Sequence, residues 1–243
     1  MPSLAARDLT APHRARLIAA GADPEVLATL SLTAFTAHPL AGSWTADGNT
    51  LYVAAGVEPP RAAILDRLVL YPVADTLIVL ASQTENLVSL GVGGDGATIF
   101  IGPDCEFTAG DLYCGSESSI VFNGGVTATR CAVVDARNGG SIVAEHGQLW
   151  AANVYVATDD MHRLADLATG ARLNPFGARI RLGRHVWIGR DVSITGHAEV
   201  GDDVVIGMQS MVRGQKIPPN TAVGGVPARV IREGITWSQE DLP

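Results

Sequence analysis

The sequence predicts a mainly β protein that folds as a parallel β-helix, and three observations lead to this prediction. Residues 182–217 divide into six blocks of six residues without an insertion, and an aliphatic residue begins each block: Leu182, Ile188, Ile194, Val200, Ile206 and Val212. Glycine follows directly in four of these blocks, at Gly183, Gly189, Gly201 and Gly207. The fifth position of each block is small or β-branched except at Lys216. A six-residue period fits neither an α-helix nor a simple alternation, and it is the period of a parallel β-helix.

Each six-residue block supplies one short strand and one tight turn, so three blocks complete a triangular coil of about 18 residues. The aliphatic side chain points into the narrow interior, and the glycine after it relieves a turn that a Cβ atom would crowd. Residues one coil apart in sequence, such as Gly189 and Gly207, then lie on successive coils. These glycines either leave a shallow track along the prism or serve only as turn residues.

The composition suits such a protein and excludes several others. The chain has 243 residues with 27 glycines and a mean hydropathy of +0.21, which allows a continuous apolar interior and glycine-rich corners. A net charge of −8 argues against nucleic acid or an anionic membrane as the main partner. Pro72 and Asp75 interrupt the longest apolar stretch, so no membrane span is expected, and no secretory signal is recognised. Three cysteines without a CxxC motif favour reduced thiols in a cytoplasmic protein: Cys105, Cys114 and Cys131.

Residues 1–88 do not follow the six-residue period, and their pattern predicts a small N-terminal α+β domain. Residues 11–20 have helical character and end at Gly21. Asp23 and Pro24 have the form of an N-cap and a first-turn proline, which opens a second helix to about Phe35. Strands, or a short helix between them, are expected over residues 51–57, 67–71 and 76–80.

The β-helix is expected over residues 89–226, with one interruption. The six-residue period is weak over residues 89–157 and clear from Leu182 onward. Residues 158–179 are polar, contain turn-forming pairs and break the period, so they are expected to project from one corner of the prism. Residues 227–243 are expected to form a C-terminal cap, with a short helix over the open end of the coils.

Three parts of the sequence carry a resemblance to a known family. They are the six-residue repeats, the segment Asp160-Met161-His162 followed by Thr169-Gly170-x-Arg172-x-Asn174, and the ending Val226-Pro227-Ala228-Arg229-Val230-Ile231. Over residues 89–237 the chain resembles the hexapeptide-repeat acyltransferases, in particular the polysaccharide O-acetyltransferases and the maltose and galactoside acetyltransferases. The resemblance implies a left-handed β-helix and a homotrimer. It also implies that acetyl-CoA lies along the coils, in a cleft between neighbouring prisms.

His162 matches the position of the family's catalytic base. Histidine can take a proton from a hydroxyl near neutral pH, so the resemblance implies direct attack of the acceptor oxygen on the thioester, without an acyl-enzyme. Asp159 or Asp160 could orient the imidazole, although either could equally be a turn residue, and Asp160 is also a candidate for contacting the acceptor. Arg172 and Asn174 are candidates for contacting the acceptor or for shaping the cleft. The cysteines lie in presumed strands, which disfavours a cysteine nucleophile.

The cofactor is expected along the repeats. The resemblance places Trp187 beside the thioester, and packing between subunits is the alternative role for this exposed ring. Gly189, Gly207 and Ser210 are expected to line the pantetheine arm. Between Gln209 and Arg232 the sequence has four cations and no acid, which predicts a basic patch for the phosphates or else a set of solvated charges: Arg213, Lys216, Arg229 and Arg232.

Other functions are weighed against this one. An N-acetyltransferase for an amino sugar would need the same base and the same cleft. A non-catalytic β-helix scaffold would need neither the projecting loop nor the cations. A zinc site between subunits is not expected, because His146, His162, His185 and His197 include no close pair on one coil, and the last two are expected to be surface residues. The sequence therefore predicts an acetyl-CoA-dependent O-acetyltransferase for a sugar or polysaccharide hydroxyl, with no metal.

Overall fold

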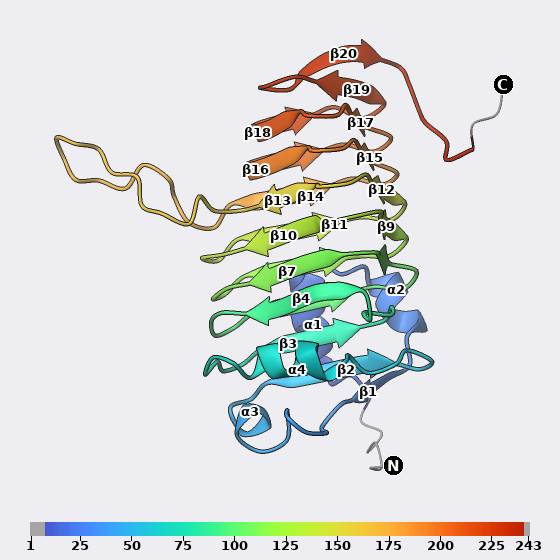
Figure 1. Ribbon diagram of the computed structural model, residues 1–243, viewed down its shortest axis with the longest axis vertical. Coiled ribbons are helices and arrows are strands. Elements are labelled where there is room, and N and C mark those ends of the chain that lie inside the picture. The colour runs from blue at the N-terminus through green and yellow to red at the C-terminus, as the bar shows by residue number, and fades with distance from the viewer. Residues whose placement is uncertain (1–7, 241–243) are drawn as a thin grey trace.

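The computed structural model describes residues 8–240, and it consists mainly of short parallel strands wound into a prism (Figure 1). Two sheets build this prism, one of 13 strands and one of 7 strands. The fold is therefore the predicted parallel β-helix. The aliphatic residues that begin the six blocks are all buried in its interior: Leu182, Ile188, Ile194, Val200, Ile206 and Val212.

The 13-stranded sheet forms two of the three faces. The first face contains β2 (Thr50–Ala54), β3 (Leu77–Leu80), β5 (Thr98–Ile101), β8 (Ser119–Phe122), β11 (Ser141–Ala144) and β14 (Arg179–Leu182). The second face contains β4 (Leu87–Val92), β7 (Gly110–Cys114), β10 (Ala132–Ala136) and β13 (Tyr155–Ala157).

Two longer strands, β16 (Ser193–Val200) and β18 (Met211–Ile217), cross the corner between these faces. Residues 193–195 of β16 pair with β13 on the second face, and residues 198–200 pair with β14 on the first face. Gly196 and Gly214 stand at the bends with φ of 69° and 60°, a left-handed conformation that glycine adopts without steric cost.

The 7-stranded sheet forms the third face. It contains β6 (Glu106–Phe107), β9 (Val126–Ala128), β12 (Gln148–Trp150), β15 (Trp187–Ile188), β17 (Val205–Ile206), β19 (Thr221–Gly224) and β20 (Arg229–Glu233). Trp187 pairs with Val205, so a coil in this region has 18 residues. Tyr113 pairs with Asp135 and Glu106 pairs with Thr127, so the lower coils have 22 or 21 residues. The longer lower coils explain why the six-residue period is weak there.

One apolar core fills the prism from Leu40 to Ala228. In the lower coils, Phe122 packs edge to face against Phe107 and Trp150, with ring centroids 5.2 and 5.7 Å apart, a geometry that aromatic pairs prefer. Among the helices within residues 8–240, none is long and apolar enough to cross a bilayer.

The N-terminal segment covers the outside and the lower end of the prism (Figure 1). α1 (Ala11–Ala20), α2 (Pro24–Thr29) and β1 (Leu32–Ala34) form a second apolar cluster with the outer side chains of the first face. The predicted helices are confirmed, but the second ends at Thr29 because the following residues form β1, antiparallel to β2. α3 (Ser43–Ala46) and α4 (Ala62–Leu68) contribute Trp44 and Leu68 to the main core. Residues before and after position 88 therefore share one core.

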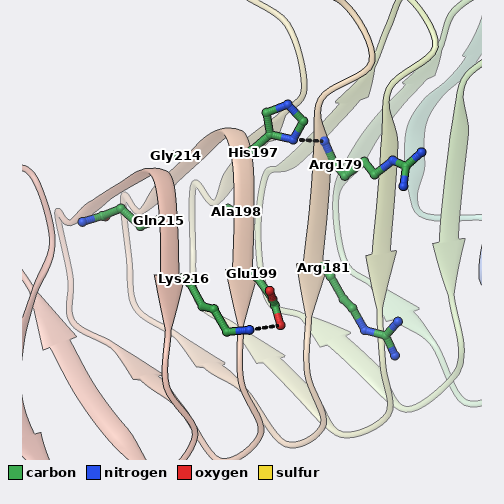
Figure 2. Close-up of a pocket in the computed structure, with 8 residues that line it drawn as sticks. All are labelled: Arg179, Arg181, His197, Ala198, Glu199, Gly214, Gln215 and Lys216. Atoms are coloured by element: carbon green, nitrogen blue, oxygen red, sulfur yellow. Dashed lines mark hydrogen bonds and ion pairs between the residues drawn. The ribbon is translucent and has the colours of Figure 1, made fainter.

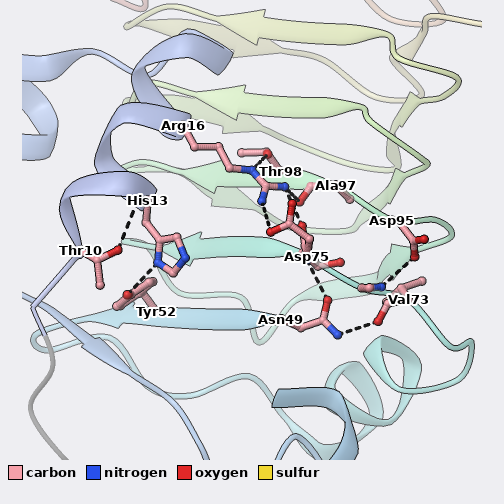
Figure 3. A network of polar contacts seen from close by, with 12 residues as sticks. Thr10, His13, Arg16, Asn49, Tyr52, Val73, Asp75, Asp95, Ala97 and Thr98 are labelled. Carbon is pink, nitrogen blue, oxygen red and sulfur yellow. Dashed lines mark hydrogen bonds and ion pairs between the residues drawn. The ribbon is translucent and has the colours of Figure 1, made fainter. Parts of the chain in front are cut away.

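Arg16 fastens α1 to the edge of the first face (Figure 3). Its guanidinium donates to the hydroxyl of Thr98 at 2.8 Å and to the carbonyl oxygen of Ala97 at 2.9 Å. It also donates to the carboxylate of Asp75 at 2.9 Å and to the carbonyl oxygen of the same residue at 2.8 Å. One side chain thus connects the helix to two successive coils.

The C-terminal region differs from its prediction. Residues 229–233 form β20, which pairs antiparallel with β19, and no helix occurs between residues 227 and 240. The predicted capping helix is therefore wrong. A strand forms instead because the edge of β19 offers unpaired backbone groups, with which a neighbouring strand can pair.

Residues 158–178, here called the arm, project from the corner between the first and second faces (Figure 1). They connect β13 to β14, close to the predicted limits. The arm folds back on itself: Ala165 and Arg172 form an antiparallel bridge, and the N–H of Leu173 donates to the carbonyl oxygen of Leu164 at 2.8 Å.

Candidate functional site

The base of the arm brings several predicted functional residues together. A pocket of about 190 Å³ lies there, lined by both ends of the arm and by Gly196 and His197. Asp160 accepts two hydrogen bonds from the guanidinium of Arg213, at 3.1 and 2.9 Å. The Asp160 and Arg213 side chains are 34% and 53% exposed, so solvent screening limits this ion pair to about 1 kcal/mol or less. The ion pair connects the arm to β18. It engages the side chains of Asp160 and Arg213, which are predicted from the sequence to contact the acceptor and the cofactor.

Within the arm, polar side chains brace its two antiparallel segments. The Nδ2 of Asn174 donates to the carbonyl oxygen of His162 at 2.7 Å, and its Oδ1 accepts from the N–H of Leu164 at 2.8 Å. The guanidinium of Arg172 lies over the ring of Phe176 at 4.1 Å, and its Nε donates to the carbonyl oxygen of Asn174 at 2.5 Å. Arg172 and Asn174 therefore hold the arm in shape, while the side chain of His162 is exposed.

Three predicted cofactor residues lie on the third face or at its edge. Trp187 is 41% exposed and begins β15. Gly189 and Gly207 lie one above the other, and a Cβ atom at Gly189 would lie 2.6 Å from a backbone nitrogen of the next coil. Ser210 is different, because it is buried and its hydroxyl accepts the N–H of Gly225 at 3.1 Å. Its carbonyl oxygen also accepts the N–H of Ser193 at 3.0 Å, so Ser210 takes part in the packing between coils.

The four cations predicted to bind phosphate do not form one patch. Arg213 lies on the second face, where it pairs with the arm, and Lys216 lies on the first face. Arg229 and Arg232 lie in β20, beside the third face. The prediction of a single basic patch is wrong because β18 bends at Gly214, which places residues three positions apart on different faces.

Lys216 lines an open groove of about 410 Å³ on the upper part of the first face (Figure 2). Its ammonium lies 2.9 Å from the carboxylate of Glu199. In the same groove, Nδ1 of His197 accepts the backbone N–H of Arg179 at 3.2 Å, so the neutral ring carries its proton on Nε2. Since that tautomer has no free basic nitrogen, His197 fits a structural role at the base of the arm.

His162 and Trp187 do not meet within one chain. The arm that carries His162 leaves the corner between the first and second faces, whereas Trp187 belongs to the third face. Figure 1 shows the arm and the 7-stranded sheet on different sides of the prism. A site that uses both side chains therefore needs a second copy of the chain.

A cluster that sequence reasoning missed lies at the edge between the first and third faces. His185, expected to be a simple surface residue, stacks on Trp237 with ring centroids 4.2 Å apart and an interplanar angle of 11°. Its Nδ1 lies 2.8 Å from the carboxylate of Asp203, which also accepts the hydroxyl of Thr236 at 2.8 Å. The bond from His185, and then that from Thr236, hold the pKa of the Asp203 carboxyl below its usual range. The ring of Trp237 lies 6.0 Å from that of Trp187, so this cluster adjoins the third face.

The cysteines differ in their surroundings. Burial raises the pKa of the Cys105 and Cys114 thiols to about 12, so neither is a nucleophile near neutral pH. Cys131 is exposed. Within residues 8–240 no three His, Cys, Asp or Glu side chains converge as metal ligands would.

A model of a known family matches the upper coils of this chain. The family described as "Bacterial transferase hexapeptide (six repeats)" matches residues 179–214, from β14 to the bend of β18. These residues therefore carry the hexapeptide repeat of that family. Galactoside O-acetyltransferase of Escherichia coli (strain K12) is 50% identical over 54 residues, which are 22% of this chain and 26% of that protein.

Two further O-acetyltransferases resemble this chain. The putative lipopolysaccharide biosynthesis O-acetyl transferase WbbJ of Escherichia coli (strain K12) is 42% identical over 52 residues, 21% of this chain and 26% of that one. The match to polysialic acid O-acetyltransferase of Neisseria meningitidis is longer, with 24% identity over 187 residues, 68% of this chain and 86% of that one. The chain thus spans only about a quarter of the length of the first two relatives.

Solved structures extend the likeness to the fold. The polysialic acid-specific acetyltransferase NeuO superposes with a TM-score of 0.55 at 23% identity, over 70% of this chain and 71% of that one. The chain therefore has the left-handed parallel β-helix fold that the sequence resemblance implied.

Proposed function

We propose that this chain is an acetyl-CoA-dependent O-acetyltransferase that acts on a hydroxyl of a sugar or polysaccharide. The observation that carries the proposal is the match of the chain, at 50% identity over 54 residues and 42% over 52 residues, to two proteins named as O-acetyltransferases, together with the hexapeptide repeat of its upper coils. These coils include Trp187 and Gly189, and they begin where the arm with His162 ends.

His162 is the proposed general base. Its imidazole takes the proton of the acceptor hydroxyl as the oxygen attacks the carbonyl carbon of the thioester. The tetrahedral intermediate then breaks its carbon–sulfur bond, and the thiolate of CoA receives the proton from the imidazolium. The exposed position of His162 on a braced arm supports this role, because Asn174 fixes the backbone beside the ring and leaves the ring itself open to a substrate.

We propose that the cofactor binds on the third face. Trp187 offers an exposed ring beside the thioester, and the close-packed glycines above it leave backbone accessible to the amides of pantetheine. Arg229 and Arg232 stand above them in β20 and would meet the phosphates. Arg213 and Lys216 are already paired with acids on the other two faces, which gives them weaker claims to this role.

Each active site is proposed to lie between two copies of the chain, in a homotrimer. The separation of His162 from Trp187 within one chain supports this arrangement, because the arm of one copy can reach the third face of the next. A closed ring of such contacts repeats one interface around its axis, so every copy supplies one arm and one third face.

The chemistry is tested by measuring CoA release from acetyl-CoA with a panel of methyl glycosides. We expect His162→Ala to lower kcat by about 10²–10⁴-fold, as removal of a general base does, with little change in the KM for acetyl-CoA. The matched control is His197→Ala, which removes a histidine whose Nδ1 is occupied and should keep activity within about tenfold. Equal turnover by His162→Ala and the wild type would exclude His162 as the base. Transfer only to amino sugars would favour the N-acetyltransferase, and no transfer at all would favour a scaffold.

The shared site is tested by mixing two inactive variants. Each of His162→Ala and Trp187→Ala lacks one half of every site, but a mixed ring contains sites in which both halves are intact. Random co-assembly in equal amounts should restore about one quarter of the wild-type activity, because half of the arms and half of the third faces are functional. Complete absence of recovery in mixed rings, whose formation is checked by mass spectrometry, would place each site within one chain.

A further inference from the structure

The edge between the first and third faces has a gap. Each coil places one residue with a left-handed φ on this edge: Asp104, Gly125, Gly147, His185, Asp203 and Asn220. Four of these residues carry side chains that project outward, but Gly125 and Gly147 are neighbours in the stack and have none. A pocket of about 510 Å³ occupies this interval, a volume within the roughly 300–1,000 Å³ of small-molecule sites. We call this pocket the notch.

The C-terminal tail, residues 234–240, forms one wall of the notch. The tail runs from β20 along this edge past three successive coils, and it forms a hydrogen bond with each of them. The N–H of Ile235 donates to the carbonyl oxygen of Asn220 at 3.0 Å, and Thr236 donates to Asp203. The indole Nε1 of Trp237 donates to the carbonyl oxygen of His185 at 2.8 Å, which fixes the ring at the upper end of the notch.

One backbone donor in the notch lacks a protein partner. Along this edge the N–H of the turn residue donates to a carbonyl oxygen of the coil below, as Gly125, His185, Asp203 and Asn220 do at 2.8–3.0 Å. Among the described residues, no acceptor takes the N–H of Gly147. Gly147 as a residue is half-buried, and an N–H that leaves water without a partner loses hydrogen-bond energy, which an acceptor oxygen of a ligand would restore.

The lining of the notch matches a neutral, hydroxyl-rich ring. It contains an aromatic ring, several uncharged polar groups and one acid, and neither Lys nor Arg contributes to it: Gly125, Thr127, Gly147, Gln148, His185, Trp237, Ser238, Gln239 and Glu240. The carboxylate of Asp203 can only accept from Nδ1 of His185, so the neutral form of this ring offers Nε2 as an acceptor. Donors, acceptors and an aromatic surface together are what a sugar ring requires, whereas the phosphates of CoA would need cations.

The notch also lies where an acceptor is needed. Its floor residues Gln148 and Thr127 belong to β12 and β9, which are one and two strands below Trp187 on the third face. Neighbouring strands are about 4.8 Å apart, so the notch begins within about 5–10 Å of the level of that ring. The proposed cofactor approaches Trp187 from above, from Arg229, and the acceptor must reach the thioester from the other side.

We infer that the notch binds the sugar ring of the acceptor, with the N–H of Gly147 donating to a hydroxyl oxygen and the side of Trp237 packing against the ring. This inference rests on the proposed function for the identity of the ring as an acceptor, but its binding can be measured separately. The C-terminal tail is thereby a part of the substrate site, in addition to closing the edge of the prism.

The test fills the notch with a side chain that the same edge accepts elsewhere. Gly147→Asn introduces the residue type of Asn220, which has φ of 56° at the equivalent turn. A Cβ atom at Gly147 would lie no closer than 3.5 Å to any neighbour, which is ordinary contact, so the variant should fold. Gly139→Asn is the matched control, because it makes the same change at a left-handed turn on another edge, where a Cβ atom meets nothing within 4 Å.

Binding is measured by ligand-observed NMR with methyl β-galactoside, methyl α-glucoside and the methyl glycoside of N-acetylglucosamine, in the absence of acetyl-CoA. At least one of these sugars should bind the wild type, and Gly147→Asn should weaken it about tenfold or more, while Gly139→Asn changes its Kd less than twofold. Trp237→Ala should weaken the same sugar. No binding to the wild type up to the solubility limit, or equal Kd in wild type and Gly147→Asn, would overturn the inference.

The transfer assay separates this inference from the proposed function. If a bound sugar is acetylated by the wild type and Gly147→Asn raises only the KM for that sugar, both proposals hold. If the wild type binds sugars in the notch but transfers no acetyl group, the proposed function fails and the notch remains a sugar site. If transfer occurs with an unchanged sugar KM in Gly147→Asn, the notch is excluded and the proposed function stands.

Discussion

Gly189 and Gly207 offer a sharp way to separate packing from ligand binding, because both were predicted to line the cofactor and both lie on the third face. A Cβ atom at Gly189 would lie 2.6 Å from the nitrogen of Met208, about 0.8 Å inside the lower limit of ordinary contact. All three nearest atoms are backbone atoms of the next coil, so they cannot move aside alone. At Gly207 the nearest atom would be the carbonyl oxygen of Val223 at 3.3 Å, which needs a shift of only about 0.1 Å.

Gly189→Ala should therefore destabilise the protein by about 1–3 kcal/mol, as overpacking does, and Gly207→Ala by less than about 1 kcal/mol. For a chain of this size the first change corresponds to a fall of roughly 2–12 °C in Tm. Differential scanning calorimetry without any ligand measures it, with circular dichroism as a check on the fold. If the two variants unfold within about one degree of each other, the close approach between coils does not explain the glycine at position 189.

Two further predictions concern the lower part of the molecule and the thiols. Arg16→Ala should lower the free energy of unfolding, measured by urea titration, by roughly 2 kcal/mol, because the charged hydrogen bonds to Thr98, Asp75 and Ala97 are lost together. The control Arg14→Ala on the same helix should change it by less than about 0.5 kcal/mol. Similar effects of both substitutions would show that these hydrogen bonds do not hold α1 in place. Ellman's reagent at pH 8 should modify one thiol per native chain, that of the exposed Cys131. The thiols of Cys105 and Cys114 should not react, because burial raises their pKa to about 12. Rapid reaction of a second thiol would contradict that burial.

The fold was predictable wherever the coil length is constant. From Leu182 onward each coil of the third face adds 18 residues up to β17, so inward positions recur at a fixed spacing and can be counted. In the lower coils the 22-residue spacing of pairs such as Ile120 and Ile142 adds residues at the turns, and the six-residue period fades. The C-terminal strand could not be predicted from the sequence, because β20 forms by pairing with the free edge of β19. The residues of β20 alone are compatible with a helix as well as with a strand.

The site was predictable residue by residue but not as an arrangement. His162 and Trp187 can be identified from their motifs. Whether they lie on the same side of the prism depends on the corner from which the arm projects, and the sequence does not reveal that corner. Arg213 and Lys216 lie on different faces because the strand bends at the glycine between them. The order of charged residues in the sequence does not indicate such a bend. The spacing of His185 and Asp203, one coil apart, is the signal that could have revealed their contact. Trp237 belongs to no repeat, and only the path of the tail brings it to them.

Both ends of the prism carry a strand that runs against the others: β1 is antiparallel to β2, and β20 is antiparallel to β19. A stack of parallel coils is otherwise an open template, since each edge presents the hydrogen-bonding pattern that the next identical coil would satisfy. A reversed strand spaces its donors and acceptors for a different partner, so on that face a second prism placed end to end would find no matching register. At each end of the prism one face is thereby closed to the growth of a fibre.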